Sequence, residues 1–236
     1  MSDSNYFALL EACPKPGCPV CRLVRETAEH FLDGLFYEMV NDAGMRRQLR
    51  RSLGFCKDHV RVLLDTHLRD PLGLTNIYHD MLDKILSDLL LASLPKPETG
   101  VFETSRGHLP KNLARQVESL RQSLSPYERC PACRLQEQSI SLSIELLVNN
   151  LEDETLYQAL GASDGLCLPH LLRALEQIQT EDQFVKLVTT SVSKIRILRD
   201  ELAEFLRKSD YRFSKEGFGE KGNAYKRVME LLIGNE

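Results

Sequence analysis

Six cysteines and two histidines recur in one pattern in the two halves of the chain. The first half contains Cys18-Pro-Val-Cys21 and, about 34 residues later, Cys56-Lys-Asp-His59. The second half contains Cys130-Pro-Ala-Cys133 and, after a similar interval, Cys167-Leu-Pro-His170. Three thiolates and one imidazole form a tetrahedral ligand set that suits zinc in a closed structural site. The repeat therefore predicts two such sites, one within each half.

The predicted metal ligands form two groups of four, and we expect the members of each group to converge on one point. The first site would use Cys18, Cys21, Cys56 and His59, and the second site would use Cys130, Cys133, Cys167 and His170.

The CPxC motif is typical of the start of a helix. Proline is favoured at the first helical position, where its missing N–H breaks no hydrogen bond. Cys18 would then be the N-cap and Cys21 would lie in the first turn, beside free backbone N–H groups and the positive end of the helix dipole, which favour thiolates. Gly54 and Gly165 indicate the ends of preceding helices, so each C-x2-H element would also begin a helix. Two helix N-termini would thus meet at each metal.

The sequence leaves three alternatives to zinc open. Buried cysteines can be small apolar core residues, although the repeated register argues against that. A thioredoxin-like dithiol needs a βαβ context, and the C-x2-H elements would stay unexplained. An iron–sulfur cluster is the third alternative, because Cys13-x4-Cys18-x2-Cys21 followed by Cys56 imitates the plant-type ferredoxin spacing. The corresponding position to Cys13 in the second half is Ser125. The simpler interpretation of Cys13 is a free thiol. The alternative is that Cys13 and His59 exchange with one another as a metal ligand.

The elements that must position these ligands are helices. Apolar residues recur at about the helical period over Arg22–Val40 and over Glu181–Arg207, and we find no alternating strand pattern. The sequence predicts an all-α fold of two similar helical repeats, each stapled by a metal site, with a helical C-terminal tail. The expected boundaries are residues 1–94, a linker at 95–110, 111–207 and a tail at 208–236, because residues 95–110 are rich in turn formers.

Composition limits the function classes. The chain has 236 residues, 42% of them hydrophobic, with a formal net charge of −4 and a pI near 5.9. This charge gives no whole-chain argument for nucleic acid, and no apolar run is long enough to span a membrane. The N-terminus lacks the basic region of a secretory signal. We expect a cytoplasmic protein, where cysteine clusters indicate metal or redox chemistry rather than disulfides.

One basic cluster lies beside the first predicted site and consists of Arg46, Arg47, Arg50 and Arg51. Such runs are most often solvated helix faces, and the alternative is a surface for an anionic partner. The second half does not repeat these arginines, so any such surface belongs to one half only.

The duplicated CPxC and GxCxxH motifs, with KSDYRF from Lys208 and YKRVMELLIG from Tyr225, give the chain a resemblance to an uncharacterised prokaryotic family, a domain of unknown function. The resemblance implies no activity. From the residues we expect a non-enzymatic zinc protein that acts as a binding or adaptor module, with a protein as a possible partner. The alternative is a redox or metal-sensing protein that uses iron–sulfur clusters or reactive thiols.

Overall fold

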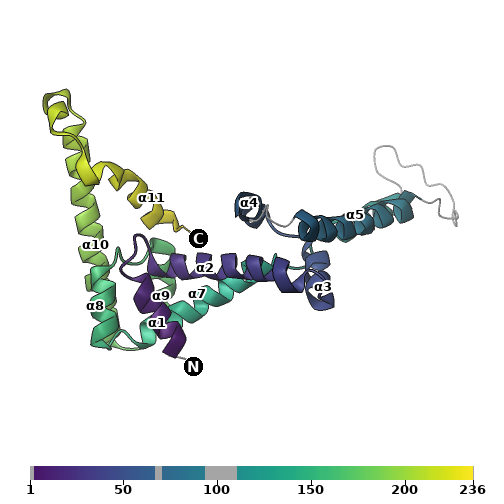
Figure 1. Ribbon diagram of the computed structural model, residues 1–236, viewed down its shortest axis with the longest axis horizontal. Helices are drawn as coiled ribbons and strands as arrows, with labels where there is room; N and C mark the ends of the chain where they lie inside the picture. The colour runs from purple at the N-terminus through teal and green to yellow at the C-terminus, as the bar shows by residue number, and fades with distance from the viewer. Residues whose placement is uncertain (1–2, 67–70, 94–110, 236) are drawn as a thin grey trace. The chain divides into compact units, whose positions relative to one another are not determined.

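The computed structural model describes residues 3–66, 71–93 and 111–235, and every regular element in these ranges is helical (Figure 1). The all-α prediction is confirmed. The predicted linker at 95–110 lies outside the described residues. The α-helices of the first half are α1 (Asp3–Ala12), α2 (Pro19–Gly34), α3 (Ala43–Ser52), α4 (Lys57–Thr66) and α5 (Pro71–Ser93). A π-helical turn, η1 (Leu35–Met39), continues α2.

The second half repeats the order of these helices. Its α-helices are α6 (Lys111–Ser123), α7 (Pro131–Asn149), α8 (Glu154–Ala162), α9 (Leu168–Leu175) and α10 (Glu181–Lys208). The tail adds the 3-10 turns η2 (Tyr211–Glu216) and η3 (Gly219–Asn223) and then helix α11 (Ala224–Ile233). Within the described ranges, no helix combines the length and the apolar character that crossing a bilayer requires.

The starts of α3 and α8 show how closely the local sequence rules repeat. Asp42 caps α3 by accepting a hydrogen bond from the Met45 N–H at 2.7 Å, and Asp153 caps α8 by accepting one from the Leu156 N–H at 2.9 Å. An aspartate at the N-cap satisfies a backbone donor that the helix cannot pair internally. Met45 and Leu156 then begin the buried face of each helix.

The chain divides into two compact units that do not coincide with the sequence halves. The first unit contains residues 1–28 and 136–236, and the second contains residues 29–135. The division falls inside α2 and inside α7, so each of these helices begins in one unit and ends in the other. This division differs from the predicted one at 1–94 and 111–207, which follows the repeat.

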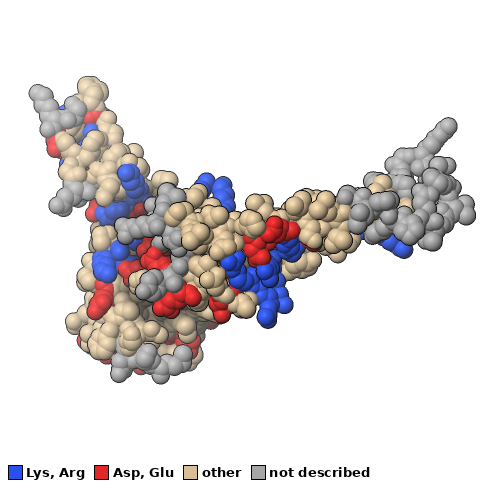
Figure 2. Space-filling view, turned by 45° about the vertical axis from the view of Figure 1, so that its right-hand side comes forward, with Lys and Arg blue, Asp and Glu red and all other residues tan. Residues whose placement is uncertain are grey.

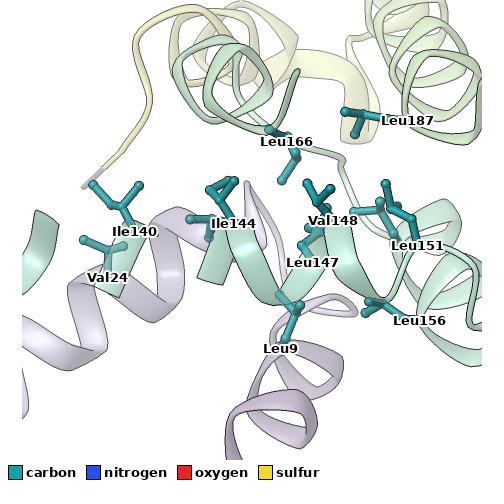
Figure 3. Packing of buried hydrophobic residues seen from close by; sticks show 13 residues of the cluster. Leu9, Val24, Ile140, Ile144, Leu147, Val148, Leu151, Leu156, Leu166 and Leu187 are labelled. Carbon is teal, nitrogen blue, oxygen red and sulfur yellow. The ribbon is translucent and has the colours of Figure 1, made fainter. Parts of the chain in front are cut away.

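The core of the first unit is built around α7. Ile140, Ile144 and Leu147 are almost fully buried and share one cluster with Val24 of α2 and Leu9 of α1 (Figure 3). Helices α8, α9 and α10 complete it with Leu156, Ala174 and Leu187. Each fully buried aliphatic side chain contributes about 1.5–3 kcal/mol relative to exposure, so this cluster holds the first unit together.

The core of the second unit gathers the end of α2 and the start of α7 with α3, α4 and α5. Leu32 and Leu35 are fully buried in a cluster with Leu49 of α3, Leu63 of α4 and Ile77 of α5. Cys130 and Ala132, at the start of α7, belong to the same cluster. The core of the second unit therefore surrounds one CPxC motif.

Candidate metal centres

The eight predicted ligands form two clusters, each of three sulfurs and one imidazole nitrogen. In each cluster the four donor atoms all lie within 4.8 Å of one another. Cluster 1 consists of Cys18, Cys21, Cys167 and His170, and cluster 2 consists of Cys56, His59, Cys130 and Cys133. Each compact unit holds one cluster.

The predicted grouping of the ligands is wrong. We expected Cys18 and Cys21 to meet Cys56 and His59, and the structure instead places them with Cys167 and His170. We expected Cys130 and Cys133 to meet Cys167 and His170, and the structure instead places them with Cys56 and His59. The reason lies in α2 and α7, because each carries the chain out of the unit in which its CPxC motif lies. The next C-x2-H element therefore lies in the other unit, beside the other CPxC motif.

Cluster 1 is built from two helix starts, as the motifs predict. Cys18 directly precedes α2 and its carbonyl accepts the Arg22 N–H at 3.2 Å, while Cys21 lies in the first turn. Cys167 is the N-cap of α9 and His170 lies in that helix's first turn, after Pro169. Unpaired N–H groups at both helix starts favour negative charge on the sulfurs.

The distances in cluster 1 fit ligands around one ion. Cys21 Sγ lies 3.6 Å from Cys167 Sγ. The Nδ1 atom of His170 lies 3.5 Å from Cys18 Sγ, 3.5 Å from Cys21 Sγ and 3.1 Å from Cys167 Sγ. A tetrahedron with zinc–ligand bonds of the usual length has edges of about 3.8 Å between sulfurs and about 3.5 Å between sulfur and nitrogen.

Cluster 2 has the same construction and similar distances. Cys130 precedes α7 and Cys56 precedes α4, and their carbonyls accept the N–H groups of Arg134 and Val60. Cys56 Sγ lies 3.5 Å from Cys133 Sγ. The Nδ1 atom of His59 lies 3.1 Å from Cys56 Sγ and 3.4 Å from Cys133 Sγ, and 3.8 Å from Cys130 Sγ.

Hydrogen bonds join the segment before each CPxC motif to the other half of the sequence. At cluster 1 the Gly17 N–H donates to Asp164 Oδ2 at 2.7 Å. At cluster 2 the Tyr127 N–H donates to the Arg51 carbonyl at 2.7 Å, and the Arg51 guanidinium donates to Glu128 Oε1 at 2.8 Å. Asp164 lies in the turn that leads into Cys167, and Arg51 lies at the end of α3, shortly before Cys56. These bonds help to hold each CPxC motif beside the C-x2-H element of the other sequence half.

The ligands are buried enough for their thiols to affect one another. His59, His170, Cys21, Cys130 and Cys167 are buried, and the remaining three cysteines are half-buried. In cluster 1, hydrogen bonds from Cys167 and then from Cys21 hold the pKa of Cys18 well below its usual range. Hydrogen bonds with Cys167 and then with Cys18 raise the pKa of the Cys21 thiol. Packed thiols thus compete for protons, and a dication removes that competition by stabilising all three thiolates.

Gly234 and Asn235, which follow α11, lie against cluster 1, and the motifs gave no sign of this contact. The Asn235 N–H donates to Cys21 Sγ at 3.4 Å. Gly234 has a φ of +80°, and a side-chain Cβ there would lie 3.6 Å from Cys167 Sγ and 3.7 Å from Cys21 Sγ. A glycine after the last helix is an ordinary helix-ending signal, so nothing in the sequence connects it with the cysteines.

Cys13 lies outside both clusters, so the interpretation of it as a ligand finds no support in the geometry. Its side chain is buried. Burial, and then the negative charge of Cys18, raise the pKa of the Cys13 thiol to about 11. A neutral, buried thiol of this kind is inert.

The basic cluster of α3 is largely engaged within its own unit. Arg50 donates two hydrogen bonds to Asp80, at 2.8 and 2.6 Å, and Arg46 donates to the carbonyls of Val40 and Asn76. Arg51 binds Glu128. Figure 2 shows basic and acidic side chains next to one another on the face it presents. Three of the four arginines therefore have structural roles, and an anionic partner at Arg46, Arg47, Arg50 and Arg51 stays a prediction.

Comparison with known proteins places the chain in a family. No curated protein and no solved structure matches it. One family model, described as a family of unknown function (DUF6062), matches residues 9–236, which include both clusters and the C-terminal helix. The chain therefore belongs to the family of unknown function DUF6062.

Proposed function

We propose that the protein is a non-enzymatic helical binding or adaptor module in which two zinc ions staple segments far apart in the chain. The observation that carries this proposal is that each cluster supplies four protein ligands at the spacing of one tetrahedral ion. A catalytic zinc keeps one position for water or substrate, whereas these sites would be filled by the protein. A structural role for two bound ions is therefore the function that the geometry supports best.

The spacing of the ligand atoms favours a single ion over an iron–sulfur cluster. In an iron–sulfur cluster the ligands are distributed over two or more irons, so their atoms spread further apart than ligands of one ion. The four atoms of each cluster lie within 4.8 Å of one another. Among single ions, a Cys3His set is most typical of zinc.

The energetics of closing the chain also favour bound metal. Cluster 1 joins Cys21 to Cys167 across 146 positions, and cluster 2 joins Cys56 to Cys133 across 77 positions. The logarithmic part of the closure entropy costs roughly 4 kcal/mol for each of these loops. Structural zinc supplies about 10–16 kcal/mol per site. The free energy of metal binding thus outweighs the closure cost of the exchanged pairing.

The adaptor part of the proposal rests on an apolar stripe along α5. Leu82, Leu86, Leu89 and Leu90 follow the helical period on one face, and each is 44–64% exposed. Exposed apolar stripes of this kind mark protein-interaction surfaces. A helical partner protein is the class of ligand that such a stripe would bind.

Metal analysis of protein prepared without oxygen tests the proposal. We expect a colourless protein with two zinc ions per chain and no acid-labile sulfide. A brown protein with iron and sulfide would contradict it and would support the alternative, a redox or metal-sensing protein. That alternative has one observation in its favour, because the half-buried Cys18 lines a cavity through which an oxidant could approach.

A further inference from the structure

The first compact unit contains a cavity of about 340 Å³ beside cluster 1. The segment around Gly17, the turn around Gly165, helix α10 and the end of α11 form its walls, and Cys18, Cys21 and Cys167 are among its lining residues. This volume lies at the lower end of the range for small-molecule sites, which is about 300–1,000 Å³. The cavity therefore suits a small ligand.

The charge of the lining is opposite to that of the whole chain, which has a net charge of −4. Four lining residues are cationic, namely Arg22, Arg25, Lys194 and Arg227. Two are acidic, namely Asp164 and Glu230. An excess of one sign of charge in a concave site attracts ligands of the other sign. The lining thus favours an anion.

One of these cations is already neutralised within the protein. The Arg227 guanidinium donates to Glu201 at 2.7 Å and lies 3.9 Å from Asp164. Asp164 also accepts the Gly17 N–H. The capacity to bind a ligand therefore has to come from the other cations.

Arg22 and Lys194 have that capacity. The Arg22 side chain donates to the Pro16 carbonyl through Nη2, while its buried Nε has no hydrogen-bond acceptor in the described part of the chain. The stem of Lys194 lies on Gly165, where a Cβ would come within 3.0 Å of Lys194 Cγ. In the ranges that the structure describes, no carboxylate lies within ion-pair distance of the Lys194 ammonium group. A buried donor without an acceptor is unfavourable, and an anionic ligand would satisfy it.

We propose that this cavity binds a small organic anion with a carboxylate or phosphate group. The anionic group would accept hydrogen bonds from Arg22 Nε and from the Lys194 ammonium group, since charge-assisted hydrogen bonds of this kind are the strong ones. The apolar part of the ligand would lie against Ile197 and Leu198 of α10, which also line the cavity. The anion would bind through Arg22 and Lys194, which are not metal ligands, although three ligands of cluster 1 also line the cavity. Such a site would make the first unit a ligand-binding module.

The test uses the full chain in its metal-loaded form, titrated by isothermal calorimetry with succinate, with inorganic phosphate and with the neutral 1,4-butanediol. We expect saturable binding of at least one anion and none of the diol. Amide signals of Gly17 and Gly165 in nitrogen-15 NMR spectra should shift along the same titration. The two anions distinguish a carboxylate ligand from a phosphate ligand.

Two variants locate the site. Lys194→Gln should weaken anion binding about tenfold or more, because it removes one charge-assisted hydrogen bond. Arg199→Gln is the matched control, since Arg199 lies on the same helix, is exposed and pairs with the adjacent Asp200. It should leave the affinity unchanged. The metal content of each variant is measured first, so that a loss of cluster 1 is not mistaken for a loss of the anion site.

Two results would overturn the proposal. The first is the absence of saturable binding of either anion to the unmodified chain, a result that does not depend on any variant folding. The second is an equal loss of affinity in Lys194→Gln and Arg199→Gln, which would show a general charge effect and no site.

Discussion

At the scale of single residues, the chemistry of the clusters follows from short motifs. A proline after the first cysteine starts a helix, and the second cysteine three positions on lies in its first turn. The structure places Cys21 and Cys133 in this way. His59 and His170 take the equivalent position in α4 and α9. Ligand type and local geometry could be predicted because both are set within four residues.

Replacing one ligand tests whether the metal is structural. Cys21→Ser should release one ion and lower the free energy of unfolding by several kcal/mol, because one missing thiolate opens a closed site. Thermal melts combined with metal content measure both effects. The matched control is Cys13→Ala, which removes a buried cysteine outside the clusters and should keep both ions. A Cys21→Ser protein that loses its ion and keeps its melting temperature would support the sensor alternative.

The thiol of Cys13 should be unreactive in the folded protein. Its pKa of about 11 lies above the ordinary value of 9.0 because burial disfavours the thiolate. A raised thiol pKa keeps the neutral form, so at pH 8 only about one part in a thousand is thiolate. Iodoacetamide followed by peptide mass spectrometry should therefore leave Cys13 unlabelled until the chain is unfolded. Labelling of Cys13 at the rate of a free thiol in the native state would contradict its burial.

At the scale of helices, the sequence predicted the elements and not their partners. Periodicity located α2 and α10, and the repeat located α7, α4 and α9. The grouping of ligands was wrong because we assumed that the chain returns to its own CPxC motif. Helix α2 advances about 24 Å over its 16 residues, whereas α3, with 10 residues, covers about 15 Å. Helices α7 and α8, with 19 and 9 residues, differ still more in length. Each longer helix ends in the other unit, and the C-x2-H element that follows it therefore lies in that unit and not beside its own CPxC motif.

The contact of the chain end with cluster 1 should affect how firmly the metal is held. Gly234→Val combines a positive φ with a branched side chain beside two ligand sulfurs, so it should displace the Asn235 N–H from Cys21 Sγ. Loss of an outer-shell hydrogen bond typically weakens metal binding by about 10–100-fold. Chelator competition should therefore release one of the two ions faster.

The control for this variant is Gly217→Val. Gly217 also has a positive φ, and a Cβ there would meet nothing within 4 Å. It introduces similar backbone strain away from both clusters, so both ions should leave at the unmodified rate. Equal release rates in the two variants would mean that the chain end has no role at cluster 1.

At the scale of the whole chain, each candidate metal site joins one half of the sequence to the other. Cluster 1 joins the start of α2 to the start of α9, and cluster 2 joins the start of α7 to the start of α4. Such long-range partners cannot be deduced from local spacing, because both halves have the same motifs and either pairing satisfies them. The bonds that accompany the observed pairing, such as Gly17 to Asp164 and Tyr127 to Arg51, involve residues outside the motifs.

Metal counting in two double variants tests the exchanged pairing most directly. In Cys21→Ser/Cys167→Ser both changes fall in cluster 1, so native mass spectrometry should show one ion remaining. In Cys21→Ser/Cys56→Ser the changes fall in different clusters, so both ions should be lost. The opposite result, with both ions lost from the first variant and one ion retained by the second, would show that each half binds its own metal and would contradict the account.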